Sequence, residues 1–286
     1  MATLRDVKRK INSIRSTQTI TRTMRMISAS KLRRAQDDLD RVNGYALRTE
    51  ELLKRMAGRI PENANPLLAE REQISKVLLF PIASDRGLSG AFNLNVATAV
   101  ERFVEENRSN YEKIGVYVVG KKIRDYLKRR KIETTKEWTD LKSVSMELAQ
   151  TMASDLTQLY LDGEFDKIYL IYTYFRSAIK QEVVFEEFLP LKTVKTEDAF
   201  DYLYEPDMQT IVDRFIPHYI VTKIYFALVE SQTSEHAARM SAMENATNNC
   251  GEMIDYLTLV YNKTRQQSIT NEMLDIVGGA EALQST

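Results

Sequence analysis

The chain has 286 residues, and its 40 lysine and arginine residues are balanced by 40 aspartate and glutamate residues, so its formal net charge is zero. This balance argues against a wholly basic nucleic-acid-binding protein. The single cysteine, Cys250, excludes a disulfide framework, and the two histidines, His218 and His236, argue against a histidine-rich metal site. Because the sequence has no run of about 18 apolar residues, we expect no transmembrane helix.

The N-terminal segment is basic and has two interpretations. Residues 1–26 are rich in Arg, Ser and Thr and contain one acid, Asp6, a composition that is also typical of a mitochondrial transit peptide. The apolar spacing of this segment continues through residues 27–57, as in a single long helix. We therefore favour a helix that belongs to the mature protein.

Two long helical arms are predicted at the ends of the chain. Glycine and proline are absent from residues 1–43 and 218–250, and apolar residues recur there in alternating steps of three and four, the pattern of a coiled coil. These seam positions are Leu4, Val7, Ile11, Ile14, Leu32, Ala35, Leu39, Val42, Ala46, Thr49, Leu53, Met56, Met240, Met243, Thr247, Cys250, Ile254, Leu257, Tyr261 and Thr264. Two amphipathic helices on a globular core are the alternative, but a helix of about 57 residues would be about 85 Å long. We expect an antiparallel pair formed by residues 1–60 and 207–286, with a central domain at residues 74–195.

The two arms carry opposite charge. Residues 1–36 contain ten basic residues and one acid, whereas residues 225–286 contain three basic residues and eight acids. Pairing of the arms would bring these charges together, although each exposed pair is worth little. The surplus positive charge on the first arm predicts an acidic partner, either nucleic acid or an acidic protein surface.

The middle of the chain alternates between strand-like and helix-like segments. Strands are predicted at residues 76–80, 116–119, 168–172 and 183–185, and helices at residues 92–106, 121–130 and 143–161. Strands separated by helices are typical of a layered α/β domain with a largely parallel sheet.

Two glycine-containing segments and one histidine could carry chemistry. Gly115–Lys121 has the G-x-x-x-x-G-K spacing, but Lys122 replaces the Ser or Thr of a phosphate loop and the intervening residues favour a strand. Ser84–Asn93 could bind an anion at a helix N-terminus, but we favour a tight turn in which Asp85 or Ser89 caps backbone donors. His236 lacks the second histidine of a metalloprotease motif, so we expect it to be solvated or to face the other arm.

Several segments, in the same order along the whole chain, resemble one family. They are Leu4–Ile11, Thr19–Thr21, Met24–Leu32, Ser84–Leu88, Ser234–Met240, Met243–Thr247, Tyr261–Gln266 and Ile276–Ala280. In these segments the chain resembles the gamma subunit of bacterial F-type ATP synthases. This resemblance also assigns the basic N-terminal segment to the family's first helix rather than to a transit peptide.

The resemblance implies an α/β fold, with a long antiparallel coiled coil of the N- and C-terminal helices and a central Rossmann-like domain. It implies a non-catalytic rotor shaft without a cofactor, which lies inside a ring of three alpha and three beta subunits. It further implies contacts with the epsilon subunit and the membrane c-ring, and a peripheral location on the cytoplasmic face of the bacterial membrane. Neither nucleic-acid binding nor membrane insertion is implied.

The resemblance also implies which residues contact the beta subunits. Residues of the first arm would face acidic beta-subunit loops: Arg9, Arg22, Met24, Arg25, Arg33 and Arg34. Near the end of the chain, Arg265, Gln266 and Thr270 would bind a loop of one beta subunit, with Arg265 as the strongest contact. Family members commonly carry an acid at the position of Arg25, so we expect Arg25 to slow ATP hydrolysis. The paired cysteines of chloroplast relatives are absent, which argues against thiol control.

Two other functions can be drawn from the residues alone. A basic coiled-coil adaptor for nucleic acid would bind in a strongly salt-dependent way. An enzyme that uses nucleotides on its α/β middle domain would show saturable nucleotide binding by the isolated chain. Neither alternative explains two matched long arms around a small domain.

Overall fold

The computed structural model describes residues 4–57, 65–69, 71–141, 143–192 and 205–284. It divides into two compact units, Met1–Ile27 with Ala242–Thr286, and Ser28–Ser241, which we call the tip unit and the head unit. Helices α1 (Leu4–Ala57) and α5 (Met208–Gln284) contribute residues to both units.

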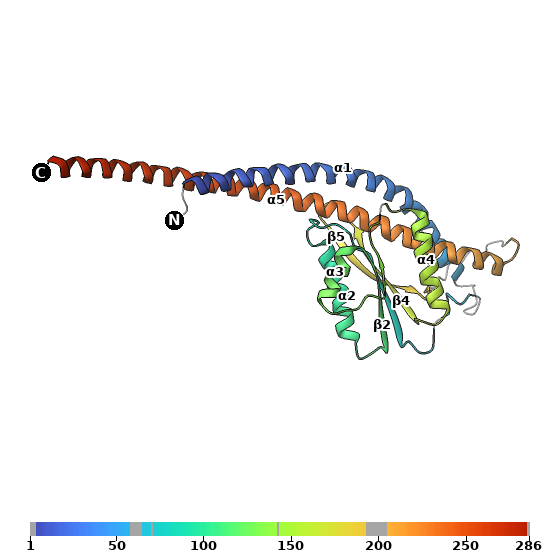
Figure 1. The fold of residues 1–286 in the computed structure, drawn as a ribbon. Helices are drawn as coiled ribbons and strands as arrows, with labels where there is room; N and C mark the ends of the chain where they lie inside the picture. Colours follow the sequence, from blue (N-terminus) through green and yellow to red (C-terminus); the bar gives the residue numbers. More distant parts are fainter. Residues whose placement is uncertain (1–3, 58–64, 70, 142, 193–204, 285–286) are drawn as a thin grey trace. The chain divides into compact units, whose positions relative to one another are not determined.

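In the tip unit, the start of α1 pairs with the last part of α5 (Figure 1). Val7, Ile11 and Leu257 form its buried apolar cluster. Further along, the Thr247 hydroxyl donates to Thr21 Oγ1 over 2.9 Å. Because residue numbers rise on one helix as they fall on the other, the pair is antiparallel, and the predicted coiled coil is confirmed here.

The head unit contains a five-stranded sheet in the order β3-β2-β1-β4-β5. Its strands are β1 (Lys76–Pro81), β2 (Lys113–Val119), β3 (Lys136–Trp138), β4 (Lys167–Phe175) and β5 (Gln181–Leu189). Strands β1 to β4 pair in parallel and β5 pairs antiparallel to β4. The predicted α/β domain with a largely parallel sheet is therefore confirmed.

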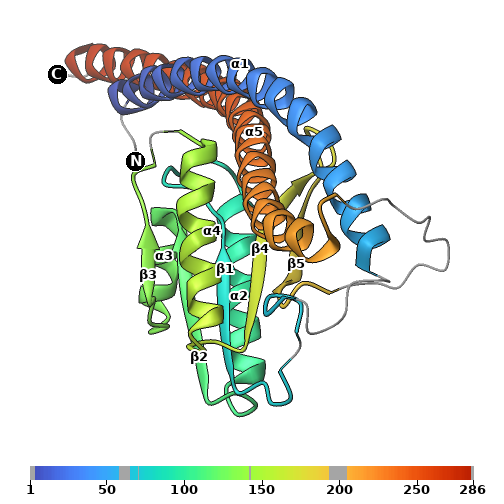
Figure 2. The same ribbon diagram turned by 90° about the vertical axis from the view of Figure 1, so that its right-hand side faces the viewer.

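Helices cover both faces of this sheet, as Figure 2 shows. Val77 and Leu79 of β1 belong to an apolar cluster with α2 (Phe92–Asn107) and α3 (Lys121–Arg129). The alternate residues Leu78 and Phe80 belong to a second cluster with α4 (Met146–Leu161), α5 and the end of α1. Successive side chains of a strand point to opposite faces, so a continuous apolar strand is what this double burial requires.

The glycines of the G-x-x-x-x-G-K segment serve packing. Gly115 lies in β2, where an added Cβ would come within 2.5 Å of the Phe165 ring. Gly120 has a φ of +106°, and an added Cβ there would lie 2.7 Å from the Ala83 carbonyl oxygen. The segment is thus a strand and the start of α3, as its apolar residues predict, and not a loop around phosphate.

Three details differ from the sequence predictions. The helix expected from residue 143 begins at Met146, because the Ser145 hydroxyl accepts a hydrogen bond from Leu148 N and caps it. Strand β3 has three residues and no apolar alternation, so the pattern did not indicate it. The strand expected at residues 183–185 extends over Gln181–Leu189, because it pairs with β4 along this length.

Candidate functional site

The predicted beta-subunit contacts of the first arm lie on α1. In the tip unit, Arg9 and Arg22 are exposed, whereas Met24 and Arg25 are partly buried. In the head unit, Arg33 and Arg34 are exposed. Exposed basic side chains along a helix can attract an acidic surface without a fixed geometry.

Arg25 has a partner within the chain. Its guanidinium forms an ion pair with Glu244 of α5, with 3.0 Å between Arg25 Nη1 and Glu244 Oε1. Both side chains remain about two-fifths to one-half exposed, so the pair contributes at most about 1 kcal/mol. Arg25 is therefore available to a second acidic group only in competition with Glu244.

The predicted contacts near the end of α5 are all exposed. Arg265, Gln266 and Thr270 lie within little more than one helical turn. The Thr270 hydroxyl donates to the Gln266 carbonyl oxygen over 2.9 Å, a bond inside the helix that leaves the Gln266 side chain free to bind elsewhere. Nothing in the tip unit covers this face of the helix among the described residues.

The sequence analysis predicted only polar contact residues near the end of α5, but the same region also exposes apolar side chains. Large apolar side chains on the last part of α5 are at least half exposed: Met253, Tyr256, Leu259, Ile269, Met273, Leu274, Ile276 and Val277. Contiguous exposed apolar surface marks an interaction site. The missed signal was that apolar residues occur here outside the coiled-coil seam positions.

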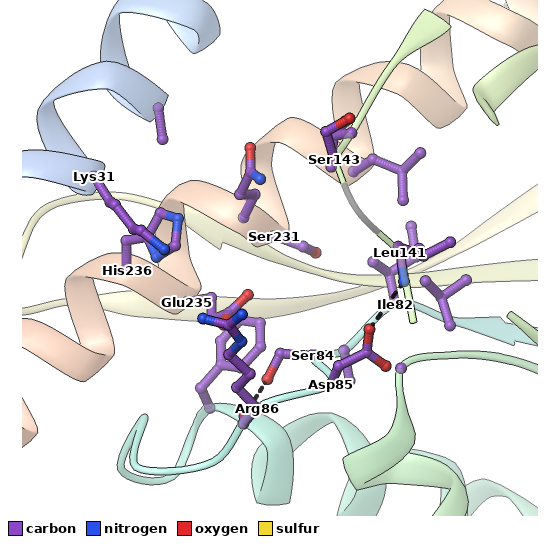
Figure 3. A pocket seen from close by; sticks show the side chains of 18 of the residues that line it. Lys31, Ile82, Ser84, Asp85, Arg86, Leu141, Ser143, Ser231, Glu235 and His236 are labelled. Carbon is purple, nitrogen blue, oxygen red and sulfur yellow. Dashed lines mark hydrogen bonds between the residues drawn. The ribbon is translucent and has the colours of Figure 1, made fainter. Parts of the chain in front are cut away.

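The head unit contains a cavity of about 560 Å³ where β1 and β2 end (Figure 3). It is lined by Ile82–Arg86 after β1, by Val119 and Gly120 at the end of β2, and by residues of α1 and α5. The carboxyl ends of parallel strands are where doubly wound sheets bind ligands. We refer to it as the head cavity.

One wall of the head cavity is the turn after β1. The Asp85 carboxylate accepts hydrogen bonds from Lys121 N over 2.9 Å and from Leu141 N over 3.1 Å. Asp85 thus caps α3 and the segment after β3, not the helix α2 that directly follows the turn. Capping by Asp85 was predicted, but its targets are distant in sequence and could not be read from local spacing.

A second wall is α5, which holds the same turn in place. The Arg239 guanidinium donates twice to the Gly87 carbonyl oxygen, each over 3.2 Å, and pairs with Glu235 over 2.7 Å. Arg239 is 8% exposed, so this contact is largely desolvated. The turn is therefore fixed to α5 by a guanidinium whose charge is already matched by Glu235.

His236 was expected to be solvated or to face the other arm, and it shares a cavity with Lys31 and Arg34 of that arm. Its imidazole lines the head cavity, and its Nδ1 atom is buried with no hydrogen-bond partner among the described residues. Burial, assisted by the positive charges of Arg239, Lys31 and Arg86, lowers the pKa of His236 to about 4. The imidazole is therefore neutral at physiological pH.

Side chains of α5 also complete the hydrogen bonding of β4. Strand β1 pairs with β4 only as far as Ile171. Beyond it, Ser231 accepts from Thr173 N over 3.2 Å, Ser234 donates to Thr173 O over 3.2 Å, and Glu230 accepts from Phe175 N over 2.7 Å. Burial raises the pKa of Glu230 to about 7. Sequence patterns could not predict these bonds between elements.

Metal-binding clusters and membrane-spanning helices are the two remaining classes of site. No cluster of three or more His, Cys, Asp or Glu side chains that could hold a metal ion occurs among the described residues. Within the same residues, no helix is both long enough and apolar enough to span a bilayer.

Comparisons with known proteins agree over the full chain. The ATP synthase family model matches residues 3–283. The ATP synthase gamma chain of Anaeromyxobacter sp. (strain K) is 43% identical over 99% of this chain and 100% of its own length. That of Moorella thermoacetica is 42% identical over the same shares.

Solved structures give a similar result. A chain from the central stalk and c-ring of the Tetrahymena thermophila mitochondrial ATP synthase has a TM-score of 0.62 at 27% identity, with 79% of this chain and 99% of that chain covered. A chain from the Euglena gracilis mitochondrial ATP synthase has a TM-score of 0.71 at 22% identity over 99% and 95%, which supports the fold. The chain belongs to the ATP synthase gamma chain family.

Proposed function

We propose that this chain is the central rotor shaft of a proton-translocating F-type ATP synthase. It couples rotation of the membrane ring to the conformational cycle of the catalytic beta subunits, in synthesis and in hydrolysis, and catalyses no reaction itself. The main structural support for this function is the antiparallel helix pair, in which the end of α5 exposes both apolar and polar side chains. Full-length relatives with the name ATP synthase gamma chain support this function.

The partners in this proposal are three alpha subunits, three beta subunits, an epsilon subunit and the membrane c-ring. The similar chain from Tetrahymena belongs to a central stalk and c-ring assembly, which supports these partners. The proposed location is peripheral, on the cytoplasmic face of a bacterial membrane. The functional division is an arm at residues 1–60, a domain at residues 74–195 and an arm at residues 207–286.

The basic residues of α1 suit a moving contact. We assign the contact with acidic beta-subunit loops to Arg9, Arg22, Met24, Arg25, Arg33 and Arg34. Attraction between exposed charges depends little on direction and falls off over about 8 Å at physiological ionic strength. Such attraction changes gradually with rotation, so the helix can pass from one beta subunit to the next.

The end of α5 suits a directional contact. We assign the bond to one beta-subunit loop to Arg265, Gln266 and Thr270. A guanidinium can bind a carboxylate through two parallel hydrogen bonds, and an amide and a hydroxyl add geometric specificity. This contact distinguishes one beta subunit from the other two, which is what an asymmetric shaft must do.

The test is reconstitution with alpha and beta subunits from the same source. We expect one copy of this chain to co-purify with three copies of each partner and to support steady MgATP hydrolysis. Truncation before residue 265 should weaken assembly or activity. An otherwise intact chain with Asn262→Ser, a substitution on the same exposed helix surface, is the control. A chain that elutes alone and leaves the activity of the ring unchanged would contradict the proposal.

A further inference from the structure

Three of the cations that line the head cavity are exposed. Lys31 and Arg34 come from α1, and Arg86 comes from the turn after β1. None of the three forms an ion pair with another described residue, in contrast to Arg239 beside them, which is paired with Glu235. Unpaired cations that converge on one cavity raise the local concentration of anions.

The acids of the same cavity offset its cations only in part, because the lining has four cations and three acids. Asp85 accepts two backbone hydrogen bonds, and Glu235 pairs with Arg239. Asp38 lies 3.5 Å from Arg41, which is outside the cavity lining. Glu235 also attracts Arg86, and the lining as a whole keeps a formal charge of +1.

The place of the cavity in the fold fits a phosphate ligand. The cavity adjoins the carboxyl ends of β1 and β2, and doubly wound sheets bind ligands outside the carboxyl ends of their strands. Its volume of about 560 Å³ can hold a diphosphate and is within the usual range of small-molecule sites. Arginine and lysine are the side chains that bind phosphate oxygens.

We infer that the head cavity binds a phosphate-type polyanion through Lys31, Arg34 and Arg86. The shared chemistry of the ligand is two or more linked phosphoryl groups, either as inorganic pyrophosphate or as the phosphate chain of a nucleotide. This binding site goes beyond the rotor function. It also differs from the excluded phosphate loop, because the ligand is held by side chains that come from segments distant in sequence.

Calorimetric titration of the full chain with pyrophosphate, and separately with ATP in the absence of magnesium, tests the inference. We expect saturable binding of at least one of them at one site per chain, and the tighter ligand identifies the source of the phosphate. Arg34→Gln should weaken binding about tenfold or more, since a hydrogen bond to a charged group is worth about 1.5–3 kcal/mol. Arg33→Gln is the matched control, because Arg33 is its exposed neighbour on α1 but does not line the cavity.

A second readout reports from inside the cavity. The chain has two histidines, so proton NMR can follow His236 with His218 as an internal reference. The groups that face His236 are Lys31 from α1, Arg86 from the turn, and Arg239 and Glu235 from α5. A bound polyanion offsets the positive charges, so the pKa of His236 should rise by about one unit or more. Loss of the resonance in His236→Gln assigns the signal.

Three results would overturn the inference. One is no saturable binding of either ligand. Another is equal weakening by Arg34→Gln and Arg33→Gln, which would mean general attraction to α1. The last is equally tight binding of a pentaglutamate peptide, which would mean that the cavity recognises acidic polypeptide rather than phosphate.

Discussion

Two buried titratable residues of α5 act in opposite directions on stability. The native pKa of Glu230 is raised by burial to about 7, and that of His236 is lowered by burial to about 4. Glu230 keeps its proton in the native state up to about pH 7 but loses it near pH 4.5 when unfolded, so its contribution to stability falls as pH rises between these values. His236 is neutral in the native state but gains a proton below about pH 6.5 when unfolded, so its contribution falls as pH falls toward 4.

The contributions of Glu230 and His236 to the pH dependence of stability should therefore offset each other between about pH 4.5 and 6.5. Glu230→Gln should leave a stability that rises with pH, and His236→Gln one that falls, each by roughly 2–3 kcal/mol across this range. Urea unfolding midpoints at pH 4.5, 5.5 and 6.5 would measure this. If the unfolding midpoints of the natural chain, Glu230→Gln and His236→Gln changed with pH in the same way, the pKa shifts of Glu230 and His236 would not be the cause.

Arg25 can attract an acidic beta-subunit loop, and it also holds α1 to α5 through its ion pair with Glu244. A variant that restores the ion pair with reversed charges separates these two roles. We expect Arg25→Glu to raise MgATP hydrolysis by the assembled enzyme, because an attraction to an acidic beta-subunit loop is lost. The double variant Arg25→Glu with Glu244→Arg restores an ion pair between the helices. If the double variant also hydrolyses faster, the beta-subunit contact is responsible. If hydrolysis is unchanged in Arg25→Glu, Arg25 does not slow the enzyme.

At the scale of elements, local patterns predicted much of the fold. The heptad steps predicted the burial of Val7, Ile11 and Leu257, and runs of apolar residues predicted β1, β2 and β4. Strand β3 is held by its place beside β2 rather than by its own residues, so no local pattern indicated it. The backbone groups that bind Asp85 and Glu230 come from segments distant in sequence. The spacing of residues along the chain therefore could not predict these hydrogen bonds. The residues of the head cavity were visible in the sequence, but their convergence was not.

Two glycines should respond oppositely to substitution. Gly44 lies inside α1, and nothing lies within 4 Å of the position that an added Cβ would take, so Gly44→Ala should stabilise the chain by about 0.5–1 kcal/mol. Gly115→Ala should destabilise it by about 1–3 kcal/mol or more, because the new methyl group overlaps the Phe165 ring. Thermal unfolding of the two variants beside the natural chain would measure both. Equal effects would mean that backbone entropy alone decides the outcome.

At the scale of the whole molecule, exposed apolar surface indicates that the chain acts within an assembly. Leu259 and Ile276 on α5 are 71% and 72% exposed. Surface like this is stabilised only when another protein covers it. The stability of the isolated chain and its ability to assemble are therefore separate properties of the same helix.

We expect Leu259→Ser with Ile276→Ser to change the unfolding free energy of the isolated chain by no more than about 1 kcal/mol, since both are surface positions. Co-purification with alpha and beta subunits should nevertheless decrease clearly. Asn262→Ser, at an exposed polar position, should affect neither property. A double variant that assembles normally would show that this apolar surface is not a contact.

The bonds from Glu230, Ser231 and Ser234 to β4 have a mechanical consequence. They join α5 to the main chain of the strand rather than to its side chains. Main-chain atoms of a strand inside a sheet have little rotational freedom, and the Glu230, Ser231 and Ser234 side chains that bind them are 2%, 3% and 0% exposed. A twisting force on the sheet can therefore enter α5 within about one helical turn, through these three bonds. This short stretch of α5 is a stiff coupling through which torque passes between the sheet and the helix.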